Sequence, residues 1–213
     1  MRITSHPFII NFFSHNRLGI KKPKLPRNVR CSPPRRLPRF RGQGLGLPDA
    51  GAWAARACVG RAHGLAEQSA VDAAVGRIIE KHGHLDFLIN SAGLNLPNRR
   101  WRDITNEAWN TIIDVDLNGA FNVSHAALKV MRQQRDGLIV NVSSMASQRV
   151  GGVSGIAYTS AKHALNAMSE SINHENCHLG IRACALCPGE VATEILDLRP
   201  APPSAEERAR MVQ

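Results

Sequence analysis

The stretch "LIVNVSS", Leu138–Ser144, decides the fold class of this chain. Apolar side chains occupy both sets of alternating positions at its start, which is typical of a strand buried on both faces of a sheet. Two further apolar runs are equally short: "LDFLIN" ends at Asn90 and "IRACALC" ends at Cys187. Segments with helical periodicity precede and separate these runs. The sequence therefore predicts an α/β fold, with parallel strands joined by right-handed crossovers and flanked by helices.

The helical segments carry recognisable start and stop signals. Ser69 and Asp72 form a potential capping box at the start of the first segment, and Gly83 follows its end. A long second helix is predicted over about residues 106–134, and a third over about residues 156–176. No run of about 18 apolar residues occurs, so the sequence predicts no membrane span.

Charge divides the chain into two parts. Residues 1–65 contain 13 Lys and Arg against the single acid Asp49, whereas residues 66–213 contain 14 basic and 16 acidic residues. Seven of the twelve prolines also lie in the first part. We therefore predict an irregular basic segment over residues 1–65 that is not part of the fold, followed by an organised domain over residues 69–213.

Three interpretations of the basic segment compete. It could be a targeting segment, a basic arm for nucleic acid, or sequence foreign to the fold through a wrong start or a shifted reading frame. The third is favoured, and nucleic acid is an unlikely partner because aromatic residues hardly interleave with the basic ones, Phe40 between Arg39 and Arg41 being the exception. "GQGLG" at Gly42–Gly46 lacks a preceding strand, and Pro48 follows it, so we interpret it as a chance match to a nucleotide loop.

Five cysteines occur without a framework spacing. This pattern favours reduced thiols in a cytoplasmic protein. The spacing of His and Cys near the carboxyl end fits no common zinc module, so no metal site is predicted.

The stretch "YTSAK" brings two reactive groups together. Tyr158 and Lys162 are four residues apart in a predicted helix, which places their Cβ atoms about 6 Å apart. A cation beside a phenol lowers the phenol pKa from about 10 toward neutrality, and this would make Tyr158 a general acid/base. The simpler alternative is a helix-surface pair without a function.

Four motifs follow one another at the predicted strand ends and on the third helix: "NSAG" at Asn90–Gly93, "NVSS" at Asn141–Ser144, "YTSAK" at Tyr158–Lys162 and "PGEVAT" at Pro188–Thr193. Over about residues 69–213 the chain resembles the short-chain dehydrogenase/reductase family. The resemblance implies a Rossmann-type doubly wound sheet and hydride transfer between NAD or NADP and an alcohol/carbonyl pair. It also implies a small alcohol or ketone as substrate, and a homo-oligomer if the domain is complete.

The resemblance also implies roles for single residues. Ser144 would hold the substrate oxygen, Tyr158 would exchange the proton, and Lys162 would bind the nicotinamide ribose and lower the Tyr158 pKa. The implied cofactor-binding residues are Asn90, Ala92, Gly93, Tyr158, Lys162, Pro188, Gly189, Val191 and Thr193.

One position departs from the family pattern. Where the family has a helix asparagine, "VDLNGAF" places Asp116. Helical geometry puts Asp116 in the centre of the apolar stripe, whereas Asn118 points roughly the opposite way. We predict that Asp116 takes the place of the asparagine as a catalytic residue. A carboxylate that is merely satisfied by backbone donors is the alternative.

The family's N-terminal Gly-rich nucleotide loop and its last strand have no counterpart in the sequence. We therefore expect an incomplete sheet, in which the strand at Phe87–Asn90 exposes an edge. The predicted function is that of an NAD(P)-dependent oxidoreductase. The alternatives are a catalytically inactive truncated or frame-shifted fragment without cofactor binding, and a nucleic-acid-binding protein.

Overall fold

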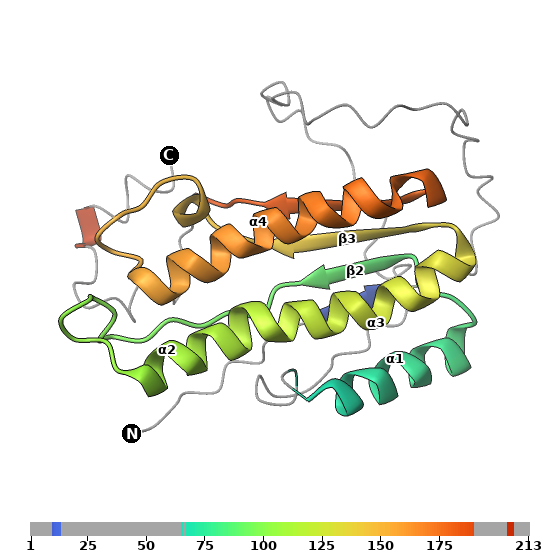
Figure 1. The fold of residues 1–213 in the computed structure, drawn as a ribbon, viewed down its shortest axis with the longest axis horizontal. Coiled ribbons are helices and arrows are strands. Elements are labelled where there is room, and N and C mark those ends of the chain that lie inside the picture. Colours follow the sequence, from blue (N-terminus) through green and yellow to red (C-terminus); the bar gives the residue numbers. More distant parts are fainter. Residues whose placement is uncertain (1–9, 14–64, 66, 190–203, 207–213) are drawn as a thin grey trace.

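The structure is a computed structural model that describes residues 10–13, 65, 67–189 and 204–206. Its strands form one sheet in the order β1-β2-β3-β4 (Figure 1). β2 (Phe87–Asn90), β3 (Gly137–Val142) and β4 (Ile181–Leu186) are parallel to one another. The three predicted strands and their parallel arrangement are therefore confirmed.

The predicted exposed edge of β2 is wrong. β1 (Ile10–Phe13) pairs antiparallel with β2, and Ile10 lies opposite Asn90. The sequence predicted no element before Ser69, because a single four-residue strand in a basic, proline-rich context has no periodic signal. Backbone pairing with β1 satisfies the ladder groups on that side of β2.

Helices cover one face of the sheet in the described residues. α1 (Gln68–His82), α3 (Gly119–Gln134) and α4 (Ile156–Asn176) lie side by side in one layer, and α2 (Asn106–Ile113) leads into α3 (Figure 1). The extents predicted for the second and third helices are confirmed. No helix in the described ranges is long and apolar enough to cross a membrane.

The predicted capping box of α1 is wrong. Glu67 occupies the N-cap position without a side-chain hydrogen bond, and Ser69 lies inside the helix. The Asp72 carboxylate instead accepts from Gln68 Nε2 at 3.0 Å. The predicted end is confirmed: Gly83 adopts φ 77°, and its N–H donates to the Ile79 carbonyl.

The long second helix contains one π-helical turn. This turn, η3 (Asp114–Asn118), separates α2 from α3 without interrupting the helical path. A π turn inserts an extra residue into the helical repeat and so changes which side chains face the sheet. It places Asp116 in the interior while Asn118 stays exposed.

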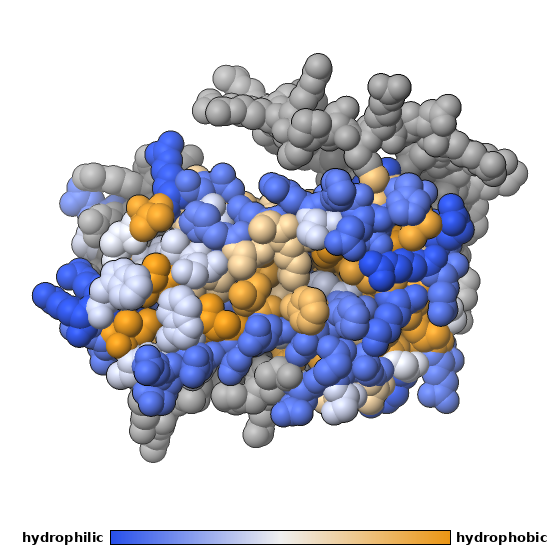
Figure 2. Space-filling view, viewed as in Figure 1, coloured by the Kyte–Doolittle hydropathy of each residue, from blue (hydrophilic) through white to orange (hydrophobic). Residues whose placement is uncertain are grey.

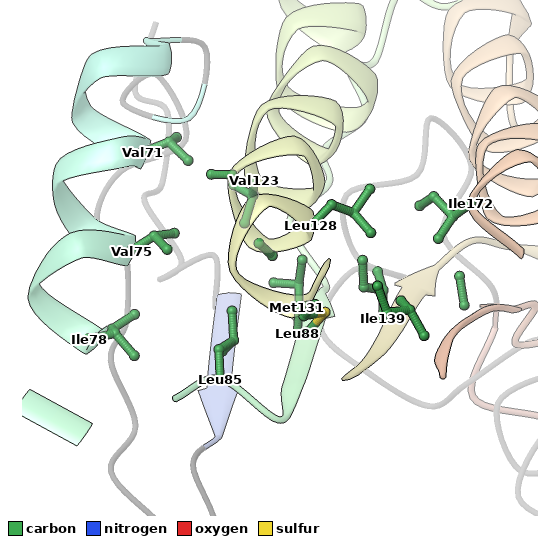
Figure 3. Packing of buried hydrophobic residues seen from close by; sticks show 14 of the residues in the cluster. Val71, Val75, Ile78, Leu85, Leu88, Val123, Leu128, Met131, Ile139 and Ile172 are labelled. Atoms are coloured by element: carbon green, nitrogen blue, oxygen red, sulfur yellow. The ribbon is translucent and has the colours of Figure 1, made fainter. Parts of the chain in front are cut away.

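The core lies between the helical layer and the sheet. Val71, Val75 and Ile78 of α1 point toward α3, where Val123 meets them (Figure 3). On the sheet side of α3, Met131 packs with Leu88 of β2 and Ile139 of β3. Burial of these aliphatic side chains stabilises the layered arrangement by about 25 cal/mol per Å² of apolar surface removed from water.

The outer side of the helical layer is also partly apolar. Figure 2 shows apolar side chains along the middle of this face, between hydrophilic margins. A groove between α3 and α4 lies on this side, and Phe121 lines it together with Met168. The Phe121 ring stacks on His125 with ring centroids 5.7 Å apart.

A chain of buried amides and hydroxyls attaches two helices to the sheet. Asn90 Nδ2 donates to Asn141 Oδ1 at 2.8 Å and to Ser124 Oγ of α3 at 2.9 Å. Asn141 Nδ2 donates in turn to Ser169 Oγ of α4 at 2.8 Å. These bonds fix α3 and α4 against the carboxyl ends of β2 and β3.

The cysteines differ in their state. Cys184 and Cys187 are free thiols, as predicted, but Cys177 is disulfide-bonded, so the prediction of reduced thiols is wrong for this residue. Spacing along a sequence does not reveal which cysteines meet in space. Within the described ranges, no cluster of three or more His, Cys, Asp or Glu side chains could hold a metal ion.

Candidate active site

The site lies at the carboxyl ends of the three parallel strands. Segments that follow such strands meet at one edge of the sheet, where ligands of open α/β sheets bind. Backbone bonds hold two of these segments together: Ser143 N–H donates to the Leu186 carbonyl at 2.7 Å, and Met145 N–H donates to the Pro188 carbonyl at 3.0 Å. The predicted motifs after β3 and β4 are therefore neighbours in space.

The structure brings Ser144, Tyr158 and Lys162 together. Ser144 ends the extended segment after β3 and caps the short turn η4 (Met145–Ser147), where its Oγ accepts from Ala146 N–H. Tyr158 lies in the first turn of α4, and the Ser144 side chain is close enough to lower the pKa of its phenol. Lys162 Nζ lies one turn further along, 5.3 Å from the centroid of the Tyr158 ring. A hydroxyl, a phenol and an ammonium thus share one site.

Lys162 is enclosed on two sides. Its side chain is buried, and its Nζ donates to the Val142 carbonyl of β3 at 3.1 Å. The Asp116 Oδ2 atom of η3 lies 3.6 Å from the same nitrogen. Burial lowers the pKa of Lys162, and the charge of Asp116 opposes this effect. The ammonium is therefore part of a buried ion pair.

Asp116 has a relative exposure of 0%. Its Oδ1 accepts from Leu94 N–H at 2.7 Å, while no described residue gives its Oδ2 a hydrogen bond. Burial raises the pKa of Asp116 to about 6, against the lowering effects of Lys162 and of the Leu94 N–H. The structure agrees in part with each of the two interpretations of Asp116. The contact with Lys162 fits a role in the site, and the Leu94 N–H fits a carboxylate satisfied by a backbone donor.

The raised pKa of Asp116 predicts an unusual pH dependence of stability. Between its ordinary value of 3.8 and about 6, the native carboxyl holds a proton that the unfolded chain releases. Its contribution is thus present below pH 4 and falls by about 3 kcal/mol as the pH rises through 6. Urea unfolding at both pH values, compared between wild type and Asp116→Asn, is expected to show this loss only in the wild type. Parallel changes in the two proteins would contradict the prediction.

The pKa of Tyr158 moves opposite to the expected direction. Burial is the largest influence and raises it, the Ser144 side chain lowers it, and the charge of Asp116 raises it further. The expected lowering by Lys162 is not found, and burial dominates instead. Tyr158 is therefore protonated at neutral pH.

The segment after β2 approaches this site closely. A Cβ on Gly93 would lie 3.1 Å from Lys162 Nζ and 3.3 Å from Asp116 Oδ2. The absence of a side chain lets the backbone at this position reach the ion pair. Ala92 is buried beside it. The Asn90 side chain belongs to the core network, so only its backbone is available at the strand end.

The residues present fit a nicotinamide cofactor. Lys162 has three donors, of which the Val142 carbonyl takes one, and Asp116 is an ion-pair neighbour without a hydrogen bond to it. Donor capacity therefore remains for the hydroxyl groups of a ribose. Gly189 has open space where a Cβ would stand, which leaves room at the end of β4. Pro188 lies beside it, whereas Val191 and Thr193 lie outside the described residues.

Two contributions to the site were not predicted: the Val142 carbonyl, which holds Lys162, and the Leu94 N–H, which holds Asp116. Both are backbone groups, which every residue type can supply. No side-chain pattern in the sequence could have identified them.

Comparison with known proteins decides the family. A protein-family model described as short chain dehydrogenase matches residues 53–202. The chain belongs to the short-chain dehydrogenase family. This match begins at residue 53, whereas the resemblance noted in the sequence begins only at about Ser69.

Other members of the short-chain dehydrogenase family are similar to this chain over about two thirds of its length. The short-chain reductase protein NovJ of Streptomyces niveus is 35% identical over 148 residues, which cover 68% of this chain and 55% of NovJ. A 3beta-hydroxysteroid dehydrogenase of Mediterraneibacter gnavus is 32% identical over 149 residues, covering 70% of this chain and 52% of that protein. The chain spans about half the length of the curated relatives it matches.

A solved structure has the same arrangement of strands and helices. The structure of ElxO with NADP bound matches with a TM-score of 0.60 and 29% identity, over 62% of this chain and 53% of ElxO. The Rossmann-type fold predicted from the strand and helix pattern is confirmed.

Proposed function

We propose that this chain is an oxidoreductase that reduces the carbonyl group of a small ketone to an alcohol, with NADH or NADPH as the reductant. The single observation that carries this proposal is the group of Ser144, Tyr158 and Lys162 at the carboxyl ends of the parallel strands. Membership in the short-chain dehydrogenase family supports the same reaction class.

Tyr158 is the proton donor in this proposal. Because burial raises its pKa, the phenol keeps its proton at neutral pH and can give it to the developing alkoxide. The reduced nicotinamide, when bound, supplies the hydride. At neutral pH Tyr158 is therefore in the protonated form that carbonyl reduction requires.

Ser144 is the second group on the substrate oxygen. Its side chain lies close enough to Tyr158 to lower the pKa of the phenol, so one carbonyl oxygen could accept from both hydroxyl groups. Two donors aimed at the position where negative charge develops stabilise the transition state more than the ground state. Ser144 would orient the carbonyl, and Tyr158 would protonate it.

Lys162, Gly93 and Gly189 would hold the cofactor. The buried ammonium of Lys162 would donate to the ribose of the nicotinamide half, and the two glycines would leave room for it. The relative ElxO was solved with NADP bound, which supports the same class of ligand for this chain.

Nucleotide binding tests the proposal directly. We expect NADH or NADPH to quench the tryptophan emission of the purified 213-residue chain saturably, with energy transfer from Trp101 and Trp109. Lys162→Gln is expected to weaken the binding by tenfold or more, about the effect of losing a hydrogen bond to a charged group.

Lys129→Gln is the matched control, because Lys129 is an exposed lysine on α3 whose Nζ lies 3.7 Å from an Asp72 carboxylate oxygen. It is expected to leave the affinity unchanged. A chain that is folded by circular dichroism and binds neither nucleotide would contradict the proposal and favour the inactive-fragment alternative.

A further inference from the structure

Asp116 introduces a negative charge into the interior of the site. It is the only acid in the "VDLNGAF" stretch, and η3 directs it inward. Its Oδ2 lies 3.6 Å from Lys162 Nζ and has no hydrogen-bond donor among the described residues. This carboxylate is fully buried. The ammonium of Lys162 is therefore its compensating charge.

The surroundings of Asp116 supply no other charge in the described residues. From α4 it faces Lys162 and Tyr158. From the segment after β2 it meets the backbone of Gly93 and Leu94. β3 contributes the Val142 carbonyl that holds Lys162, and this group does not titrate.

On its own turn, the nearest acid is Asp114. This side chain is exposed, and its Oδ1 accepts from Asn118 Nδ2 at 2.8 Å. Among the residues that the structure describes, Asp116, Lys162 and Tyr158 thus form a titrating group of three.

We propose that Asp116 is a positioning residue that acts through Lys162: as its buried counter-ion, it neutralises the ammonium and keeps Tyr158 protonated to a higher pH than an unpaired lysine would. That this role helps Tyr158 to act as a proton donor in catalysis rests on the proposed function. The electrostatic role itself does not, because it concerns three side chains of this chain.

The physical argument compares two charges at one phenol. An unpaired ammonium near a phenol favours the phenolate, whereas a carboxylate nearby disfavours it. Lys162 Nζ lies 5.3 Å from the Tyr158 ring centroid and 3.6 Å from Asp116 Oδ2. The carboxylate therefore opposes the effect of the ammonium on the phenol. The direction of the Tyr158 pKa agrees, since Asp116 contributes to raising it.

The chain offers a selective readout, because Tyr158 is its single tyrosine. Absorbance of tyrosinate in the near ultraviolet, followed during an alkaline titration, therefore reports the ionisation of this residue alone. The measurement needs no nucleotide and no substrate. The titration can be interpreted even if the chain binds no nucleotide. Likewise, the nucleotide-binding assay can be interpreted even if the titration shows no role for Asp116.

Asp116→Asn is the decisive variant. An amide has nearly the shape of the carboxylate, and its oxygen can still accept from Leu94 N–H, but it carries no charge. We expect the ionisation midpoint of Tyr158 to fall by about one pH unit, which means about tenfold more tyrosinate at a given pH below the midpoint.

Asp114→Asn is the matched control. It removes the same charge from the same helical turn, but at an exposed position, where solvent screens it. Its midpoint is expected to equal that of the wild type. Asp116→Ser, which also lacks the charge, replaces Asp116→Asn if the amide variant does not fold.

The outcomes separate clearly. A lower midpoint in Asp116→Asn that is absent in Asp114→Asn supports the proposal. An unchanged or higher midpoint in the folded Asp116 variant overturns it. Equal shifts in the Asp114 and Asp116 variants overturn it as well, since they would indicate a general charge effect instead of a counter-ion.

Discussion

Tyr158→Phe is expected to lower kcat for ketone reduction by about 10²- to 10⁴-fold, the usual contribution of a positioned general acid. Phenylalanine keeps the ring near Lys162 Nζ and removes only the hydroxyl group that donates the proton. The affinity for NADH or NADPH is therefore expected to change little. An effect on kcat without an effect on nucleotide binding distinguishes proton donation from a structural role.

The measurement combines two assays on the same protein. Oxidation of the reduced nucleotide is followed with a panel of small ketones, and nucleotide affinity is followed by tryptophan fluorescence. Ser171→Ala is a suitable control, because it removes a hydroxyl from the far part of α4, where Ser171 Oγ bonds to exposed Glu175. Turnover by Tyr158→Phe at the wild-type rate would remove Tyr158 from the mechanism.

Gly155→Ala is expected to destabilise the fold by about 3 kcal/mol or more, because two costs combine. Gly155 has φ 77° and ψ 163°, a backbone region that is open essentially to glycine alone. A Cβ there would also lie 2.6 Å from the Arg99 carbonyl oxygen and 2.5 Å from the Arg99 Cβ. Since Gly155 is the N-cap of α4, the strain falls at the start of the helix that carries Tyr158.

Urea unfolding tests this expectation. Gly76→Ala is the matched control, because Gly76 lies inside α1 and has nothing within 4 Å of its Cβ position. The control is expected to stabilise the protein by about 0.5–1 kcal/mol through helix propensity. A wild-type unfolding midpoint for Gly155→Ala would show that the turn before α4 tolerates a side chain.

The sequence predicted the repeating parts of the fold well. The buried strand around Val140 and the helix that carries Tyr158 both have a periodicity that local sequence reveals. β1 was missed, because Ile10–Phe13 is only four residues long, and its pairing with β2 joins positions far apart in the chain. Sequence patterns report local preferences, and they contain no direct record of which distant strand becomes a neighbour.

The sequence predicted which residues come together in the site, but it did not predict the direction in which the Tyr158 pKa shifts. The i and i+4 spacing of Tyr158 and Lys162 correctly placed them together, and the helical stripe correctly placed Asp116 in the interior. The direction of the Tyr158 pKa was predicted wrongly. Spacing brings a cation to a phenol, but the net field at the phenol depends on burial and on a third group from another helix.

The amide pair between β2 and β3 fixes the register of these two strands, whose carboxyl ends carry the site. Asn90 and Asn141 are register partners, and their side chains bond to each other in the interior. A slip of one strand by one residue would turn its amide to the opposite face and leave the buried donors and acceptors of the other amide unmet. The register of β2 against β3, and with it the relative position of the two strand ends, therefore cannot change gradually. In the proposed enzyme, we expect variation in substrate choice to occur in the segments beyond Asn90 and Val142, because the strands beneath them cannot shift by small steps.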